Sequence, residues 1–506
     1  MTRPRTVSQS ALPRRIAQCM ALVVVIGTLT VLGCSKSSTS AVPVTASDLT
    51  NRSFAFTSGA GPNLATVLGL PQGQAFTLQF GNFGGTNVGP VTLDSGGSAA
   101  SGTVTLGSCT FRFDRSTFPA GRGPQSSAQF TIDPCQINSD DKTLLLGASG
   151  ETLVSAPASP LLMTNVAVVL TTDFSTGSYS VVDLASRSVF KDIKLGGVHS
   201  DAIARFFSGR VYVVNRLGAD SIQILDPQLG FITPTNGVLS VGNGTNAWDI
   251  VFVNANKAYV SRLGSPKLLI IDPTTLRSTG EIDLNPLVKP TDSDGSPEPA
   301  SMLIRNGLVY VALQHIDVKQ PQLPAVARGE VVVIDSTTDR IVSVISLNGK
   351  NPISEFQFSP ALNRILISSV GDLAVIDGGI EAINPDTNTV DSQFAVSEAT
   401  MGGDITAFVI VSRTKGFAIV SDATFANSLI TFDPSSGQRL NRLVGPLNVV
   451  MAHLAINSRN EVYMAVIDTT IATSGLRIFD ADTDNEITST PLNVGQFPPV
   501  FTVFIE

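Results

Sequence analysis

The side chains of this chain that could bind a metal ion or a polar ligand are few and lie far apart in the sequence. They are three His, four carboxylates and two Arg: His199, His315, His453, Asp249, Glu298, Glu355, Asp404, Arg216 and Arg262. Imidazole nitrogens and carboxylate oxygens coordinate cations, and a bound cation can activate water for hydrolysis. These residues form a site only if the elements that carry them bring their side chains together.

Two short acidic runs have the alternating carboxylates of calcium loops. In Asp292-Ser-Asp294-Gly295 two Asp stand two residues apart before a Gly, which predicts either a calcium loop or a solvated turn. The run that begins at Asp480 resembles the first half of an EF-hand, but Asn485 replaces the required Gly and Pro491 the bidentate Glu. We interpret this second run as a capped hairpin turn. The sequence identifies no cofactor, and a divalent cation such as calcium is the one candidate.

The composition excludes several classes of function. Neither a GxSxG nor an HExxH motif occurs, and neither a P-loop nor a GxGxxG motif does. The formal net charge is −8, and Lys and Arg form no cluster in the body of the chain. Because nucleic-acid binding depends on such clusters, we expect no nucleic acid among the partners.

A repeat supplies the elements that position the candidate residues. An apolar strand that ends in Asp, or once in Asn, recurs seven times; its last residues are Asp183, Asp226, Asp272, Asp335, Asn384, Asp433 and Asp480. The intervals are 43, 46, 63, 49, 49 and 47 residues. A four-stranded propeller blade takes about 40–50 residues, so the repeat predicts an all-β fold with a seven-bladed β-propeller over residues 159–506.

The strand Val211-Tyr-Val-Val-Asn215 and the turn Ile271-Asp-Pro-Thr-Thr275 resemble the YVTN family of propeller repeats. The resemblance covers roughly residues 161–506 and implies a propeller without implying one function, because such propellers serve many purposes. Six blades have an inner strand and the first lacks one, while the last strand, 500–505, has no partner. We expect this strand to pair into the first blade and to close the ring.

Propeller topology predicts that the candidate residues share one face. Loops that enter inner strands and loops that join second to third strands lie on the same side, and all nine candidates fall there. The longest blade has its extra residues in two loops of that face, 283–300 and 314–328. Acidic loop residues fall on blades one and five to seven: Asp173, Asp372, Asp422 and Asp468. We expect a polar funnel that binds a ligand or a metal, with neutral loop growth and ordinary rim residues as the alternatives.

Residues 1–33 have the features of an export signal. Four Arg precede an apolar run, 20–32, that is too short to span a bilayer comfortably. The run ends in Gly33-Cys34, which resembles a bacterial lipobox and implies that Cys34 is lipidated and becomes the first residue of the mature chain. A plain signal peptide and an uncleaved membrane anchor are the alternatives.

The lipobox resemblance implies a membrane partner through the lipid anchor and a place in the cell envelope. Residues 34–47 then form a flexible tether, and Ser35 after the lipidated Cys favours the outer membrane.

Residues 48–158 alternate short apolar strands with Gly, Pro and Ser turns, which predicts a small antiparallel sandwich or barrel. Cys109 and Cys135 are the only cysteines left after export and lipidation. One such pair in an oxidising compartment favours a disulfide over two buried free thiols.

These observations favour a lipid-anchored propeller without enzymatic activity, which binds or scaffolds a protein, a glycan or a small ligand in the envelope. The alternative is a propeller enzyme with its site at the channel mouth. It would be a lactonase-like or metal-dependent hydrolase, or a quinoprotein-like oxidoreductase.

Overall fold

The computed structural model describes residues 165–194, 196–468 and 473–506, together with the backbone of eight strands between residues 53 and 155. The export signal, Cys34 and the tether lie outside the described residues. In the described part of the chain no helix has both the length and the apolar character to cross a membrane.

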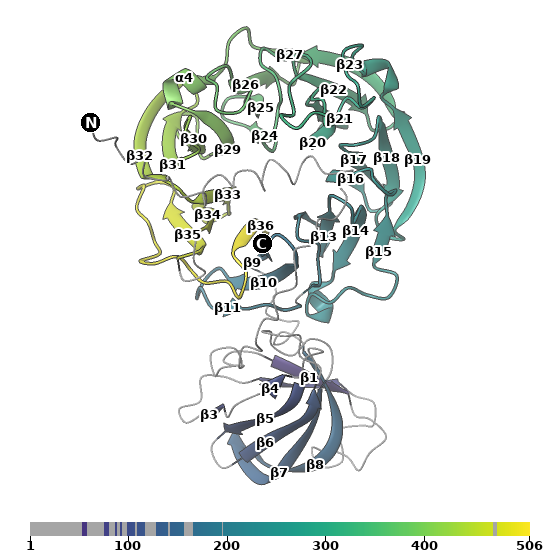
Figure 1. The fold of residues 1–506 in the computed structure, drawn as a ribbon, viewed down its shortest axis with the longest axis vertical. Helices are drawn as coiled ribbons and strands as arrows, with labels where there is room; N and C mark the ends of the chain where they lie inside the picture. Colours follow the sequence, from purple (N-terminus) through teal and green to yellow (C-terminus); the bar gives the residue numbers. More distant parts are fainter. Residues whose placement is uncertain are drawn as a thin grey trace, which may run out of the picture.

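Seven separate antiparallel sheets form a ring, as Figure 1 shows. The first is built from β36 (Pro499–Ile505), β9 (Val166–Thr172), β10 (Gly177–Asp183) and β11 (Val189–Phe190). The second is built from β12 (Ala202–Phe207), β13 (Arg210–Asn215), β14 (Ser221–Leu225) and β15 (Val238–Ser240). The third is built from β16 (Ala247–Asn254), β17 (Lys257–Arg262), β18 (Lys267–Asp272) and β19 (Arg277–Asp283).

The remaining four sheets follow in chain order. The fourth contains β20 (Pro299–Arg305), β21 (Leu308–Leu313), β22 (Glu330–Asp335) and β23 (Arg340–Ser346). The fifth contains β24 (Gln357–Ser359), β25 (Arg364–Ser369), β26 (Gly379–Asn384), β27 (Thr389–Val390) and β28 (Val396–Ser397). The sixth contains β29 (Asp404–Ile410), β30 (Gly416–Ser421), β31 (Asn427–Asp433) and β32 (Gln438–Leu447), and the short helix α4 (Glu398–Met401) precedes it. The seventh contains β33 (Val450–Ile456), β34 (Glu461–Ile467) and β35 (Gly475–Asp480).

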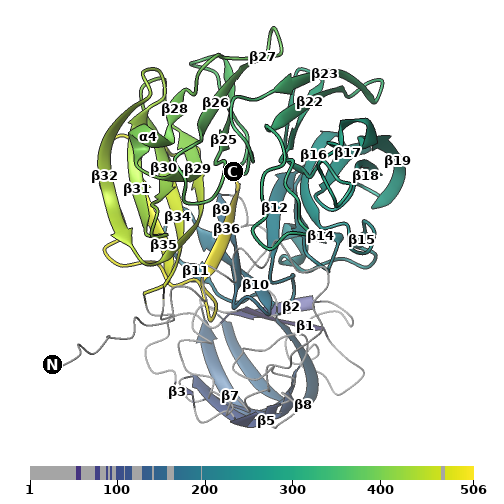
Figure 2. The ribbon, with the colours of Figure 1, turned by 45° about the horizontal axis from the view of Figure 1, so that its top comes forward.

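The C-terminal strand closes the ring in the place that the strand count predicted. β36 pairs antiparallel with β9, and the register aligns Val503 with Val168 and Ile505 with Val166. Figure 2 shows β36 in yellow beside β9 in blue. The first blade therefore combines the two ends of the propeller sequence, with β36 as its inner strand.

In five of the seven repeats, the Asp that ends the repeat caps the turn after the third strand by accepting two backbone N–H groups. Oδ1 of Asp183 accepts the N–H groups of Ala185 and Ser186 at 3.0 and 2.6 Å. Asp272, Asp335, Asp433 and Asp480 make the same pair of bonds to the residues two and three positions later. The Asp480 run is thus a capped hairpin turn, as expected.

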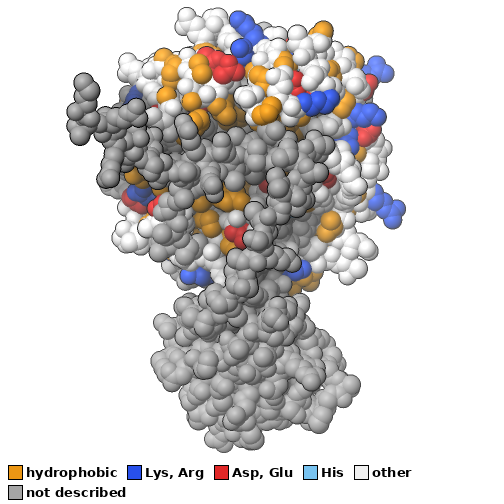
Figure 3. Space-filling view, in the orientation of Figure 1, with side chains coloured by type: hydrophobic (Ala, Val, Ile, Leu, Met, Phe, Trp, Pro, Cys, Tyr) orange, Lys and Arg blue, Asp and Glu red, His pale blue; other side chains and the backbone are white. Residues whose placement is uncertain are grey.

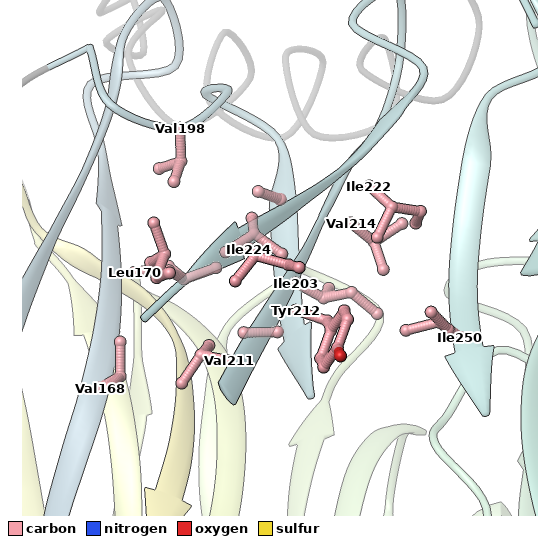
Figure 4. Packing of buried hydrophobic residues seen from close by; sticks show 14 of the residues in the cluster. Val168, Leu170, Val198, Ile203, Val211, Tyr212, Val214, Ile222, Ile224 and Ile250 are labelled. Atoms are coloured by element: carbon pink, nitrogen blue, oxygen red, sulfur yellow. The ribbon is translucent and has the colours of Figure 1, made fainter. Parts of the chain in front are cut away.

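The blades are joined by an apolar core and by Tyr side chains. Val168 and Leu170 of β9 pack with Val211 and Ile224 of the second blade, and Figure 4 shows this cluster. All five Tyr of the chain reach the next blade. Tyr179 donates to the carbonyl of Phe231 at 2.8 Å. The other pairs are Tyr212–Pro273, Tyr259–Asp339, Tyr310–Asn388 and Tyr463–Arg187.

The strands of the N-terminal region form one eight-stranded antiparallel sheet. They are β1 (Ser53–Thr57), β2 (Ala75–Gln79), β3 (Asn87–Val88), β4 (Thr92–Leu93), β5 (Ala99–Leu106), β6 (Cys109–Ser116), β7 (Ala128–Ser139) and β8 (Lys142–Ser155). Cys109 begins β6 and Cys135 lies on the neighbouring β7. The side chains of these strands lie outside the described part of the structure, so the disulfide stays a prediction.

Candidate functional site

Loops that enter inner strands and loops that join second to third strands lie on one face of the ring, which we call the funnel face. Hydrogen bonds connect these loops between neighbouring blades. The N–H of Leu217 donates to Oδ1 of Asn246 at 3.0 Å, and the N–H of Ala374 donates to Oδ2 of Asp404 at 2.7 Å. The funnel face is therefore a layer of loops that rigid strands hold in position.

Arg205 of β12 joins the inner strands at the centre of the ring. Its Nε lies 3.0 Å from Oδ1 of Asp249 on β16, and its Nη2 lies 2.5 Å from Oε1 of Glu355, which precedes β24. Because β12 belongs to the second blade and β24 to the fifth, this ion pair crosses the centre of the ring. The guanidinium also lies 5.5 Å from the ring centroid of Phe501 on β36.

His453 of β33 completes this central network. Its Nδ1 accepts the N–H of Thr502 at 3.3 Å, so the neutral imidazole carries its proton on Nε2 and donates to Oε2 of Glu355 at 3.3 Å. The imidazole stacks on Phe501, with ring centroids 3.9 Å apart. The closing strand β36 therefore also fixes the orientation of His453.

Arg205 balances part of the negative charge in the central network. Burial raises the pKa of Asp249, and Arg205 lowers it only in part. Burial also opposes ionisation of Glu355, yet Arg205 and the hydrogen bond from His453 lower the pKa of Glu355 to about 2. The Arg205 guanidinium therefore takes the place between these carboxylates where we expected a bound metal ion. Because the Glu355 side chain keeps 39% of its surface exposed, the network can still contact a polar ligand.

Asp404 and Glu398 hold a loop of the fifth blade from below. Oδ2 of Asp404 accepts the N–H of Ala374, and Oε2 of Glu398 accepts the N–H of Gly378 at 2.8 Å. Burial raises the pKa of Asp404 to about 6. Burial, together with the nearby Asp404, raises the pKa of Glu398 to about 8. Both carboxyls act on the 370–378 loop and not on the central network.

Three further predicted residues bind neighbouring loops. Arg216 pairs with Asp201 and lies 4.5 Å from the ring centroid of Trp248. Nδ1 of His199 accepts the N–H of Asp201 at 3.2 Å. Arg262 donates to the carbonyl of Val241 at 3.0 Å and pairs with Glu281 at 2.7 Å. We infer that these contacts position the funnel-face loops of blades two and three.

His315 and Glu298 lie under the two long loops of the fourth blade, and both are fully buried. Nε2 of His315 lies 2.9 Å from Oε2 of Glu330. Oε2 of Glu298 accepts the N–H of Ile316 at 2.9 Å. Above Glu298, carboxylate oxygens of Asp292, Asp294 and Asp317 all lie within 4.8 Å of one another.

The nine predicted residues therefore divide among several places on one face. Asp249, Glu355 and His453 meet at Arg205, whereas Glu298 belongs to the acidic cluster of the fourth blade and Asp404 to the 370–378 loop. Arg205 was not among the residues predicted from the sequence to form a site. Its signal was a charged residue in the middle of an apolar inner strand, Ala202-Ile-Ala-Arg-Phe206.

The fold defines this chain as a seven-bladed β-propeller. No family model matches the chain, so the YVTN likeness stays a resemblance of its repeats, and no curated protein matches it either.

Several solved structures are similar to this chain. A dihydro-heme d1 dehydrogenase, NirN, in complex with DHE is 16% identical over 69% of this chain and 76% of that chain, with a TM-score of 0.43. BamB from Moraxella catarrhalis is 13% identical over 67% of this chain and 96% of that chain, with a TM-score of 0.38. Hydrazine synthase from Kuenenia stuttgartiensis is 14% identical over 60% of this chain and 85% of that chain, with a TM-score of 0.42. We draw no functional conclusion from these similarities.

Proposed function

We propose that this chain is a membrane-tethered binding protein of the cell envelope that recognises a protein partner through the funnel face of its propeller. The observation that carries the proposal is the position of exposed apolar side chains. Thirteen large hydrophobic residues are exposed in the described part of the chain, and six of them lie at the funnel face, five on its loops and Leu447 as the last residue of β32. These six, which we call the apolar loop set, are Phe174, Leu373, Val375, Ile376, Phe425 and Leu447.

The apolar loop set belongs to blades one, five and six. Leu373, Val375 and Ile376 share the 370–378 loop and are 47, 48 and 51% exposed. Figure 3 shows hydrophobic side chains gathered around acidic ones over the region of β25 and β26. Grouped apolar side chains with a polar surround are typical of protein-binding surfaces, whereas singly exposed ones need no explanation.

Backbone strain holds two of these side chains outward. Phe174 and Phe425 have φ angles of 67° and 62°, which is rare for a large side chain. Oδ1 of Asp173 and Oδ1 of Asp422 cap the respective loops by accepting backbone N–H groups. Such strain costs about 1–3 kcal/mol per residue and persists where the surrounding structure enforces it. It supports a binding role for the two aromatic side chains.

The charge around the apolar loop set indicates the chemistry of the partner. Asp173, Asp372 and Asp377 are exposed beside it, and the chain as a whole carries a net charge of −8. Complementary potentials favour the correct partner and raise its association rate. The proposed partner therefore presents an apolar segment flanked by Lys or Arg.

Site-specific photo-crosslinking in the native host tests this proposal. A photoreactive residue at Val375 or Phe425 should form an adduct with one partner, identified by mass spectrometry, whereas one at Val342 should not. Val342 is a matched control, because it is 54% exposed on the outer strand β23.

A serine triple variant at Leu373, Val375 and Ile376 should abolish the Phe425 adduct, and the same change at Ile341, Val342 and Val344 of β23 should leave it intact. Adducts that form equally at Val342 would overturn the proposal. An adduct with a segment that lacks basic residues would overturn the assigned partner chemistry.

A further inference from the structure

A cluster of acidic residues on the funnel face lies apart from the apolar loop set. The two long loops of the fourth blade, 284–298 and 314–329, bring four carboxylates together. Asp292 and Asp294 come from the first loop and Asp317 comes from the second, and their oxygens lie within 4.8 Å of one another. Glu298 ends the first loop and is fully buried.

Two carboxylate oxygens in this cluster have no hydrogen-bond donor. Oδ2 of Asp292 and Oε1 of Glu298 are both buried without a partner. A buried carboxylate oxygen that accepts nothing is costly, so each such oxygen calls for an explanation. The Glu298 side chain lies within hydrogen-bonding reach of Asp294, so it faces the acidic residues of the two loops.

The oxygens that do have partners are held mainly by backbone groups. Oδ2 of Asp294 accepts the N–H of Val318 at 2.8 Å, and Oδ1 of Asp317 accepts the N–H of Lys319 at 3.0 Å. Oδ2 of Asp317 accepts the hydroxyl of Ser293 at 2.8 Å. These bonds tie the two loops together and orient the carboxylates, but they leave the negative charge of the cluster uncompensated.

Among the described residues, no Lys or Arg forms an ion pair with any of the four carboxylates. Lys319 donates instead to the carbonyl of Ser293 at 2.6 Å, and Lys289 pairs with Glu330 at 2.8 Å. In the central network, by contrast, Arg205 lies between the carboxylates and supplies a positive charge. Lys319 is near enough to help lower the pKa of Asp317, but it makes no ion pair with the cluster, so most of the negative charge is left for a bound cation to balance.

We propose that Asp292, Asp294, Asp317 and Glu298 bind one calcium ion, which clamps the two long loops of the fourth blade. Four carboxylates offer up to eight oxygens, and Ca²⁺ takes about 6–8 oxygen ligands in flexible geometry. Mg²⁺ demands a near-ideal octahedron and keeps several waters, and Zn²⁺ prefers nitrogen and sulfur ligands. The donor set and its origin in two loops therefore favour Ca²⁺.

The sequence pattern and the structure agree on this location. The run Asp292-Ser-Asp294-Gly295 has the spacing of a calcium loop, and Glu298 was a separate candidate, but no local pattern points to Asp317. The fold adds Asp317 from the second long loop and places Glu298 near the run. The ion would convert two long loops into one rigid part of the funnel face.

Calorimetric titration of the full chain with CaCl₂, after treatment with EGTA, tests this site. We expect one Ca²⁺ per chain, with a Kd between about 10⁻⁶ and 10⁻³ M, and a higher melting temperature in calcium. The double variant Asp294→Asn with Asp317→Asn should lose both the binding heat and the rise in melting temperature. The control Asp482→Asn with Asp484→Asn alters the acidic turn of the seventh blade and should keep both.

A single, nearly isosteric change keeps the test decisive if the double variant does not fold. Glu298→Gln should weaken calcium binding about tenfold or more while the chain stays folded by circular dichroism. Wild-type protein that shows neither heat nor a melting shift in 10 mM calcium (about tenfold above the weakest expected Kd) would overturn the proposal. An unchanged Kd in Glu298→Gln would remove Glu298 from the ligand set.

Discussion

At the scale of single residues, the buried charges of this propeller fall into two kinds. Asp249 and Glu355 share one ion-pair partner, Arg205, which reaches across the centre of the ring. Glu398 and Asp404 are instead held by backbone N–H groups, and their buried Oε1 and Oδ1 atoms have no partner. Removal of Arg205 should therefore reduce stability, whereas removal of the charge on Glu398 should change how stability depends on pH.

The first prediction concerns Arg205→Met. This change leaves the fully buried carboxylate of Asp249 without its ion-pair partner, so the free energy of unfolding should fall by about 3–5 kcal/mol. Urea denaturation measures the loss. The control is Arg364→Met, because Arg364 pairs with an exposed Asp391, where a loss of about 0–1 kcal/mol is expected. Equal losses in the two variants would show that the central ion pair contributes no more than a surface pair.

The second prediction concerns Glu398, whose pKa rises from 4.5 to about 8 in the folded state. The unfolded chain releases this proton at lower pH than the folded chain does. The contribution of Glu398 to stability should therefore be largest below about pH 4.5 and should fall as the pH rises toward 8.

The variant Glu398→Gln cannot ionise, so its melting temperature should fall less between pH 5 and pH 8 (about the range in which Glu398 loses its proton) than that of the wild type. The control Glu486→Gln, on an outer turn of the seventh blade, should follow the wild type. A variant that keeps the full pH dependence would contradict the role of Glu398.

At the scale of elements, the ring depends on one strand that comes from the far end of the chain. Phe501 and Ile505 of β36 are 6 and 4% exposed, and Phe501 also supports His453. The strand thus contributes apolar packing, main-chain pairing with β9 and the orientation of a central side chain.

Deletion of residues 499–506 should lower the free energy of unfolding by about 3–6 kcal/mol from the burial of Phe501 and Ile505 alone. Chemical denaturation measures this loss. A synthetic peptide of residues 499–506, added in trans, should restore part of the stability, because it can occupy the edge of β9. A truncated chain as stable as the wild type would mean that β36 does not hold the ring closed.

At the scale of the whole molecule, the propeller offers a loop face to a partner while the proposed lipid anchor fixes the chain to a membrane. Binding of a tethered protein to a partner in the same envelope benefits from a high effective concentration, so weak contacts can suffice. The six exposed side chains of the apolar loop set agree with such an arrangement.

The proposed lipid anchor can be tested at Cys34. Cys34→Ala should abolish incorporation of labelled fatty acid and release the chain from the membrane fraction, because the sequence contains no other cysteine in a lipobox context. Fractionation with fatty-acid labelling is the measurement. Continued membrane retention without label would indicate an uncleaved anchor instead of a lipoprotein.

The sequence by itself determined the propeller, the seven blades and the closing strand. These follow from local rules, because an apolar strand and the Asp that caps the turn after it recur at blade spacing and can be counted along the chain. Tertiary structure alone decided which charges meet. Arg205 and Glu355 pair across the ring, and Asp317 joins Asp292 and Asp294, only because closure of the ring sets distant loops and inner strands face to face. A local pattern places a side chain on a strand or loop, but it does not show which distant side chain will stand opposite.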